Sequence, residues 1–144
     1  MSAPGSRGPI VIDTDVFSAE LVPASRLAER YAPIITGRKA FISFQTAAEV
    51  RYGALRRGWG AARMLRLDTT IHRVEVVHTG PELVLAYAQL RADCEAAGHA
   101  LAQREHNADR WIAATAMRLG IPLVSNDGIF RGVRGLTLES VASA

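Results

Sequence analysis

Residues 108–127, ADRWIAATAMRLGIPLVSND, change from a helical hydrophobic pattern to a strand-like one around Gly120. The first part carries apolar residues at the spacing of one helix face: Ile112, Ala113, Ala116 and Leu119. Gly120 stands where helices commonly end, and residues 121–125 have the composition of a short buried strand, with Pro122 tolerated at its start. The stretch therefore predicts a helix that is followed directly by a strand.

The same alternation of helix and strand extends over the rest of the chain. Strand-like segments occur at residues 9–13, 40–43 and 73–77, and residues 136–138 form a candidate fifth strand. Helical patterns separate them at residues 18–36, which prolines interrupt, and at residues 46–57, 60–67 and 81–97. Strands that alternate with helices predict a parallel sheet covered on both faces. We therefore expect an α/β fold with three layers, α/β/α, around a mainly parallel four- to five-stranded sheet.

Length and composition indicate one domain. The chain has 144 residues, 49% of them hydrophobic, which suffices for one core. We expect residues 9–144 to form this domain and residues 1–8, rich in Pro, Gly and Ser, to form a flexible tail. No run approaches about 18 apolar residues and no signal-peptide core is present, so we expect a cytoplasmic protein without a membrane segment. Cys94 is the single cysteine, which excludes an intrachain disulfide and a thiolate metal cage.

The basic residues are strongly biased toward one type. Lys39 is the one lysine among 17 basic residues, and the formal net charge is +3. Arginine binds phosphate groups well, which favours a nucleic-acid partner. The chain is also rich in alanine and glycine, so GC-rich coding is the stronger explanation of the bias. Charge alone therefore does not identify a partner.

Four carboxylates lie where strands end or where the next helices begin: Asp13, Glu49, Asp109 and Asp127. Each has a structural explanation of its own. Asp13, or Asp15 beside it, is suited to cap the following helix, and Glu49 completes a capping-box pattern with Thr46. The helix dipole favours an acid in a first turn, as at Asp109, and Asn-Asp-Gly around Asp127 is ordinary turn chemistry.

The four carboxylates mean more together than singly. In a doubly wound sheet the carboxyl ends of the strands face one crevice, so the fold gathers all four acids there. Two unit charges about 5 Å apart repel by roughly 3 kcal/mol at an effective dielectric constant of about 20. Such a cluster calls for a cation, and oxygen ligands without cysteine suit Mg²⁺, with Mn²⁺ as a plausible substitute.

At this point the sequence resembles the PIN-domain ribonucleases, and among them the VapC-type toxins of VapBC toxin–antitoxin systems. The resemblance rests on IVIDTDVFS at residues 10–18, ISFQTAAEVRYGALR at residues 42–56 and the stretch at residues 108–127. It implies a Mg²⁺-dependent endoribonuclease that hydrolyses RNA phosphodiester bonds, pairs with a VapB-like antitoxin and forms a homodimer. The family's acidic quartet falls on Asp13, Glu49, Asp109 and Asp127.

The resemblance also suggests a role for each acid. Asp13 and Asp109 are the first candidates to bind Mg²⁺, Asp127 completes the site directly or through water, and Glu49 binds a second ion or orients the attacking water. Asp15, Ser125 and Asn126 are accessory candidates. Asp15 stands where the family commonly has Asn, and Gly128 stands where it often has a further polar or acidic residue. His106 is expected to be a solvated loop residue rather than a ligand.

Arginines follow Glu49 on two predicted helices. They are Arg51, Arg56 and Arg57, with Arg63 and Arg66 further along. They are candidates for contact with RNA or with the antitoxin, and Arg51, Arg56 and Arg57 would equally suit a solvated helix face.

Two other functions compete with the nuclease. Asp13 and Asp15 also resemble the Asp-x-Asp opening of haloacid-dehalogenase-like phosphatases. Those enzymes need a downstream Lys or Arg and a late pair of metal-binding acids, but Lys39 comes too early and Asp127 stands alone in its turn. The second alternative is a PIN-like module that binds RNA or a partner without cleavage. Degenerate modules are expected to lose acids, whereas this chain keeps all four.

Overall fold

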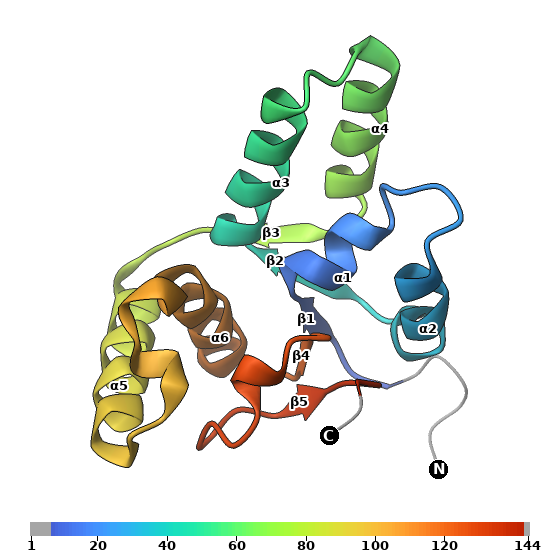
Figure 1. The fold of residues 1–144 in the computed structure, drawn as a ribbon. Helices are drawn as coiled ribbons and strands as arrows, with labels where there is room; N and C mark the ends of the chain where they lie inside the picture. Colours follow the sequence, from blue (N-terminus) through green and yellow to red (C-terminus); the bar gives the residue numbers. More distant parts are fainter. Residues whose placement is uncertain (1–6, 143–144) are drawn as a thin grey trace.

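A five-stranded sheet forms the centre of the protein in the computed structural model, which describes residues 7–142 (Figure 1). The strands are β1 (Ile10–Ile12), β2 (Ala40–Ser43), β3 (Glu75–Val77), β4 (Leu123–Val124) and β5 (Leu138–Glu139). Their order is β3-β2-β1-β4-β5, and all four neighbouring pairs are parallel. The predicted parallel sheet is confirmed, and it has the fifth strand.

Helices cover both faces of this sheet. They are α1 (Thr14–Ala19), α2 (Arg26–Ile35), α3 (Phe44–Arg56), α4 (Ala61–His72), α5 (Pro81–Ala97) and α6 (Asn107–Leu119), with 3-10 turns η1 (Ala100–Ala102), η2 (Arg104–His106) and η3 (Gly128–Phe130). Successive strand residues point to opposite faces. Ile10 and Ile12 pack in a core with residues of α1 to α4, whereas Val11 packs with residues of α5 and α6. The expected three-layer α/β/α architecture is confirmed, and α3 and α4 rise from it as a pair (Figure 1).

The ends of the helices follow the sequence in part. Gly98 and Gly120 end α5 and α6 in the left-handed region, at φ 66° and φ 67°, where glycine carries no steric cost. The capping box predicted at Thr46 is wrong, because α3 starts earlier. Ser43 caps it, and the Ser43 hydroxyl accepts a hydrogen bond from the Gln45 amide at 3.1 Å. Thr46 instead lies buried within α3.

The first part of the chain is described from Arg7 onward, so residues 1–6 of the expected tail lie outside the described residues. The Arg7 side chain donates a hydrogen bond to the Pro33 carbonyl at 2.7 Å, and the Gly8 carbonyl accepts one from Arg38 Nε at 2.8 Å. Within residues 7–142, no helix has the length and apolar character needed to cross a membrane.

Candidate active site

The sheet has one place where its chain connections diverge. From β1 the chain proceeds through β2 to β3 on one side, while β4 and β5 lie on the other. Ligands of such sheets bind beyond the carboxyl ends of the strands at this switch point, here between β1 and β4. Asp13 directly follows β1, and residues 125–127 directly follow β4. The fold therefore brings a residue from early in the chain and a loop from late in the chain to one crevice.

Asp13 is the most buried of the acids, with 4% of its surface exposed. Its Oδ1 accepts a hydrogen bond from the Thr14 amide at 2.8 Å. Of the two residues predicted as possible caps of α1, Asp13 and Asp15, Asp13 is therefore the one that caps it. Its Oδ2 accepts a hydrogen bond from the Ser125 hydroxyl at 2.6 Å. Ser125 is fully buried and its Oγ in turn accepts from the Asp127 amide at 3.0 Å. Ser125 thus connects two of the predicted acids.

Asp15 is held by the same loop. Its Oδ1 accepts from the Val16 amide at 2.7 Å and its Oδ2 from the Asn126 amide at 3.1 Å. Asp127 is an exposed residue, and it caps the turn η3 by accepting from the Ile129 amide at 3.0 Å. The structure therefore brings Asp15, Ser125 and Asn126, the accessory candidates, together at the acids.

Glu49 reaches the crevice from α3. The half-buried Glu49 carboxylate accepts a hydrogen bond from Gln45 Nε2 at 3.2 Å, one helical turn earlier. The hydroxyls of Thr14 and Thr46 lie 2.9 Å apart and connect α1 to α3. This pair of threonines fixes the helix that carries Glu49 against the helix that follows Asp13.

Asp109 lies in the first turn of α6 and is bound by an unexpected neighbour. His106 Nδ1 lies 2.9 Å from Asp109 Oδ2, and the two side chains are 25% and 27% exposed. The prediction that His106 is a solvated loop residue is therefore wrong. His106 ends the short turn η2 directly before α6, and the i,i+3 spacing places the two residues on one side of the helix start.

The start of α6 is held by residues that the sequence did not single out. The Trp111 ring stacks on Tyr87 of α5, with centroids 4.0 Å apart, and meets the edge of Phe44 of α3 at 5.6 Å. The buried Arg110 side chain donates to the Leu101 and Gln103 carbonyls at 2.8 Å and 2.7 Å. In the sequence Arg110 stands among the polar residues Asn107 and Asp109 that open α6, so the local pattern did not indicate that it would be buried.

The acids of the crevice interact electrostatically and raise one another's pKa values. Burial is the largest cause that raises the pKa of Asp13, to about 8, and the negative charges of Asp15 and Asp109 raise it further. The hydrogen bonds from Ser125 and from the Thr14 amide lower this pKa, but by less. Burial likewise raises the pKa of Asp15, with a contribution from Asp127, and that of Glu49, with a contribution from Asp109. The predicted quartet and Asp15 therefore form one set of repelling carboxylates.

The expected four-carboxylate metal site is not preformed. Among residues 7–142, no three His, Cys, Asp or Glu side chains are arranged so that they could hold a metal ion. Backbone amides hold oxygens of Asp13 and Asp15 in place. Mg²⁺ commonly binds through one or two carboxylates and takes its remaining ligands from water and substrate phosphate. The oxygen donors of this crevice fit an ion bound in that way.

A cavity of about 440 Å³ adjoins the acids. Asp15 and Glu49 line it together with residues of α1, the loop before α2 and the end of α3, among them Arg57 and Trp59. The arginine candidates differ in their placement. Arg57 lines this cavity and Arg56 is exposed in the last turn of α3, whereas Arg51 forms an ion pair with Asp68 at 2.9 Å.

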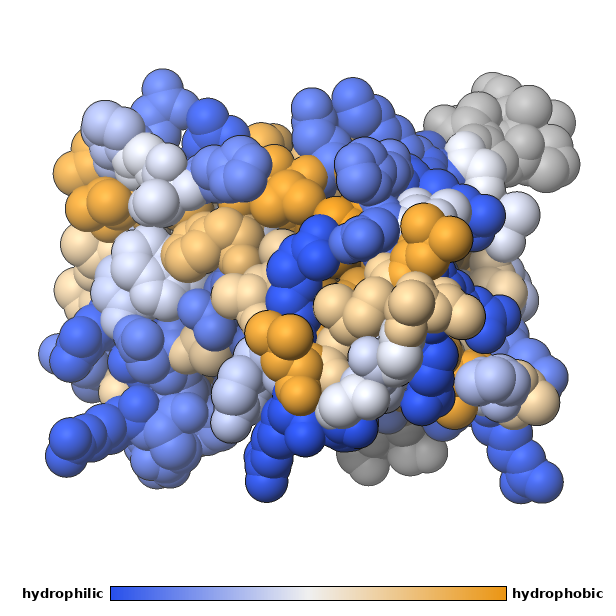
Figure 2. All heavy atoms as spheres, turned by 90° about the horizontal axis from the view of Figure 1, so that it is seen from above, coloured by the Kyte–Doolittle hydropathy of each residue, from blue (hydrophilic) through white to orange (hydrophobic). Residues whose placement is uncertain are grey.

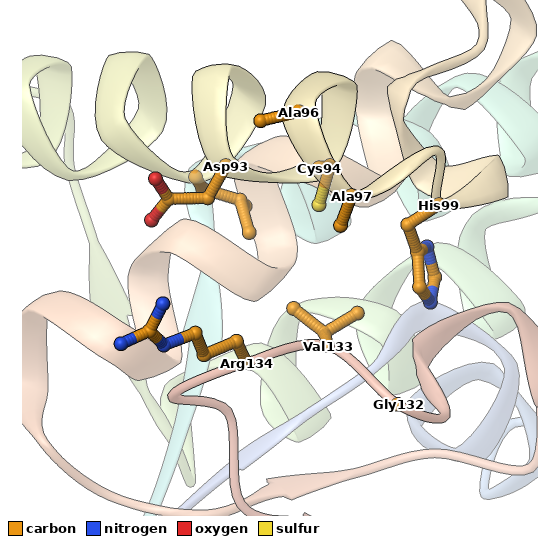
Figure 3. A pocket seen from close by; sticks show the side chains of 9 residues that line it. Asp93, Cys94, Ala96, Ala97, His99, Gly132, Val133 and Arg134 are labelled. Atoms are coloured by element: carbon orange, nitrogen blue, oxygen red, sulfur yellow. The ribbon is translucent and has the colours of Figure 1, made fainter.

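A second cavity, of about 300 Å³, lies between the end of α5 and residues 132–134 (Figure 3), and none of the crevice acids lines it. His99 lines it, but both ring nitrogens are engaged: Nε2 lies 2.7 Å from the Arg131 carbonyl and Nδ1 accepts from the Leu101 amide. Burial raises the pKa of the Cys94 thiol beside it, which disfavours a nucleophilic thiolate. The acidic crevice is therefore the candidate active site.

Fold and crevice together define an α/β protein with an acidic site at the switch point of a parallel sheet. A family model described as PIN domain matches residues 10–136, and the chain belongs to this family. No sequence among curated proteins matches the chain.

Solved structures that share this fold include three from different bacteria. VapBC2 from Rickettsia felis, bound to a promoter DNA fragment, has 21% sequence identity and a TM-score of 0.76, and the match covers 92% of this chain and 98% of that chain. FitAcB from Neisseria gonorrhoeae has 23% identity and a TM-score of 0.71, with 90% and 95% of the two chains covered. VapBC-5 from Mycobacterium tuberculosis, a member of the VapBC family of toxin-antitoxin systems, has 24% identity and a TM-score of 0.65, with 94% and 98% covered. The PIN-like fold expected from the resemblance is confirmed.

Proposed function

We propose that this protein is a divalent-metal-dependent endoribonuclease that serves as the toxin of a toxin–antitoxin pair. The observation that carries the proposal is Asp13: a buried carboxylate with a pKa raised to about 8, among four further acids at the switch point of a PIN domain. Burying a carboxylate among other acids lowers the stability of the protein, and a bound cation would offset the repulsion between them. The same cation would bind a substrate phosphate.

Asp13 and Asp109 would hold the ion, and Asp127, exposed at the rim, would contact it through water. Mg²⁺ is the proposed ion, with Mn²⁺ as a substitute; when bound it supplies positive charge to the phosphate oxygens and lowers the pKa of a coordinated water. Glu49 is half-buried with a raised pKa, which suits it to orient the attacking water and to accept its proton. Ser125 holds the Asp13 carboxylate in place through its 2.6 Å hydrogen bond.

RNA and the antitoxin are proposed to use the cavity beside Asp15 and Glu49. Arg57 lines this cavity and is the first candidate for contact with an RNA phosphate or an acidic antitoxin group; Arg56 is the second. Arg51 is a weaker candidate because Asp68 already neutralises it. The solved structures of similar fold include VapBC complexes, which supports a VapB-like antitoxin as the partner. A cytoplasmic location and a homodimer are part of the same proposal.

The test is cleavage of end-labelled total RNA by the purified, antitoxin-free protein in Mg²⁺, Mn²⁺ or EDTA. We expect discrete fragments that disappear in EDTA and in the Asp13→Ala variant. Asp93→Asn is the matched control, because Asp93 lies on α5 beside the second cavity and should leave cleavage intact. Wild-type protein that binds RNA but produces no fragments in either metal would refute the enzyme.

The two alternatives give different results in the same experiment. A non-catalytic binding module would retain RNA or antitoxin binding in Asp13→Ala and show no cleavage in any variant. A phosphatase would release phosphate from a small phosphomonoester, with Asp13 as nucleophile. The PIN-domain match favours the nuclease over the phosphatase.

A further inference from the structure

Tyr31 lies in the middle of α2 with none of its surface exposed, yet its hydroxyl meets four polar groups. The hydroxyl oxygen lies 2.8 Å from Asn126 Oδ1, 3.1 Å from the Ser125 carbonyl, and 3.1 Å from both the Val141 amide and Ser140 Oγ. These groups are 94 to 110 residues away in the chain. One side chain therefore connects α2 to the segments that follow β4 and β5.

A phenol has one proton to donate and accepts with its oxygen. The Val141 amide donates to this oxygen, and the Ser140 hydroxyl is able to donate to it as well. The Tyr31 proton then goes to Asn126 Oδ1, the nearest acceptor, with the Ser125 carbonyl as the alternative. Either choice directs the only proton of the Tyr31 hydroxyl to the loop after β4.

That loop is the one that binds the acids. The Ser125 hydroxyl donates to Asp13, and the Asn126 amide donates to Asp15. The side chain of Asn126 and the carbonyl of Ser125 thus point to Tyr31, while their other groups face the carboxylates. A hydroxyl that fixes one side of this loop determines where the other side lies.

We propose that Tyr31 is a positioning residue for the acidic site. It holds residues 125 and 126 so that their donors meet Asp13 and Asp15, and it ties this loop to the segment after β5. Its effect on catalysis rests on the nuclease function proposed above, whereas its effect on the geometry of the loop does not.

The decisive variant is Tyr31→Phe, which keeps the ring in the core and removes the hydroxyl alone. Cys94→Ala is the control, since Cys94 is a buried core residue of α5, remote from the crevice. Residue-resolved amide hydrogen exchange is measured on both metal-free proteins. We expect the amides of Asn126 and Asp127 to exchange at least tenfold faster in Tyr31→Phe, relative to the amide of Val11 in the sheet, and to be unchanged in Cys94→Ala. Equal acceleration at all amides, or none, would overturn the proposal.

Mn²⁺ affinity and RNA cleavage then measure the consequence. Tyr31→Phe is expected to bind Mn²⁺ severalfold more weakly and to lower kcat about tenfold with little change in KM. Asn126→Ala, alone and combined with Tyr31→Phe, forms a double-mutant cycle: if Tyr31 acts through Asn126, the double variant loses no more than the stronger single one. Additive losses contradict that route. If wild-type protein does not cleave RNA, the proposed function fails, and amide exchange still decides the role of Tyr31.

Discussion

Replacing Asp13 by asparagine should remove a strong dependence of stability on pH. Folded Asp13 has a pKa of about 8, against 3.8 for an ordinary aspartate. Between these values the folded state keeps a proton that the unfolded state has released, so the folded state is penalised increasingly as pH rises. Stability from this group is thus fully present below about pH 4, falls through the interval and levels off above about pH 8.

The size of the effect follows from the shift. One proton retained by the folded state alone gives a slope of roughly 1.4 kcal/mol per pH unit. Between about pH 5.5 and about pH 8 the metal-free protein should therefore lose about 3 kcal/mol, which for a chain of this size lowers Tm by roughly 6 to 12 °C. In the Asp13→Asn variant the neutral side-chain amide would keep a bond to Thr14 and, with its NH₂ donating, one to the Ser125 oxygen. The variant should therefore lack the part of the pH dependence that comes from Asp13 in this interval.

The assay is urea unfolding of wild type and Asp13→Asn at several pH values in EDTA, with the difference between the two proteins as the readout. Taking the difference removes the contribution of the histidines and other groups that both proteins share. We expect the variant to be the more stable protein at pH 8 and the advantage to shrink toward pH 5.5. Parallel pH profiles of the two proteins would refute the view that Asp13 is a buried carboxylate whose ionisation is unfavourable.

Further predictions concern the surroundings of this carboxylate. Because a cation favours ionised acids, Mg²⁺ should raise Tm more at pH 8 than at pH 5.5; an equal shift at both values would separate Mg²⁺ binding from the acids. Ser125→Ala should cost about 1 to 3 kcal/mol in urea unfolding, since Asp13 loses its 2.6 Å donor, and full stability would contradict the bond. Arg110→Met should cost about 1 to 3 kcal/mol by removing the side-chain donor of the buried Leu101 carbonyl, which calorimetry would detect; the Gln103 carbonyl still accepts from the His106 amide. Arg57→Ala should weaken RNA binding and reduce the slope of the logarithm of the binding constant against the logarithm of the salt concentration by about one, whereas Arg51→Ala should change neither. A larger loss of binding in Arg51→Ala than in Arg57→Ala would show that RNA binds elsewhere.

Much of the fold could be predicted from the sequence because its determinants are local. The glycines at positions 98 and 120 end helices. The short apolar runs form strands, and this tendency depends on their own composition rather than on which strands become their neighbours. Helix starts were less accessible. Ser43 both ends β2 and caps α3, so the pattern at Thr46 indicated a start three residues too late. An error of this kind, close to one helical turn, changes the role assigned to Glu49.

For the candidate site, the acids and the accessory residues Ser125 and Asn126 could be predicted, but their hydrogen-bond partners could not. The acids follow strand ends, which the sequence reveals, but their partners come from distant positions. Ser125 meets Asp13 across 112 residues, and Tyr31 meets Asn126 across 95. No periodicity or spacing predicts such pairs, because they depend on which strands become neighbours.

The surface of the α3–α4 pair shows the same limit. Its large hydrophobic residues Tyr52, Leu55 and Leu65 are 64%, 72% and 68% exposed, although they occur in helices that otherwise bury an apolar face. Figure 2 shows that apolar and hydrophilic residues are interspersed on the face of the molecule seen from above. Helical spacing alone does not predict which apolar residues stay exposed, because that depends on how the two helices pack.

The long span between Asp13 and Ser125 also bears on how the protein is made. A ribosome releases Asp13 and Glu49 early, while β4, which pairs with β1, and the loop that binds Asp13 emerge only after residue 120. Until then β1 lacks its neighbour β4, and Asp13 lacks its serine donor. The growing chain therefore carries most of its acids without an assembled crevice, and synthesis of the last part of the polypeptide acts as the step that completes the site.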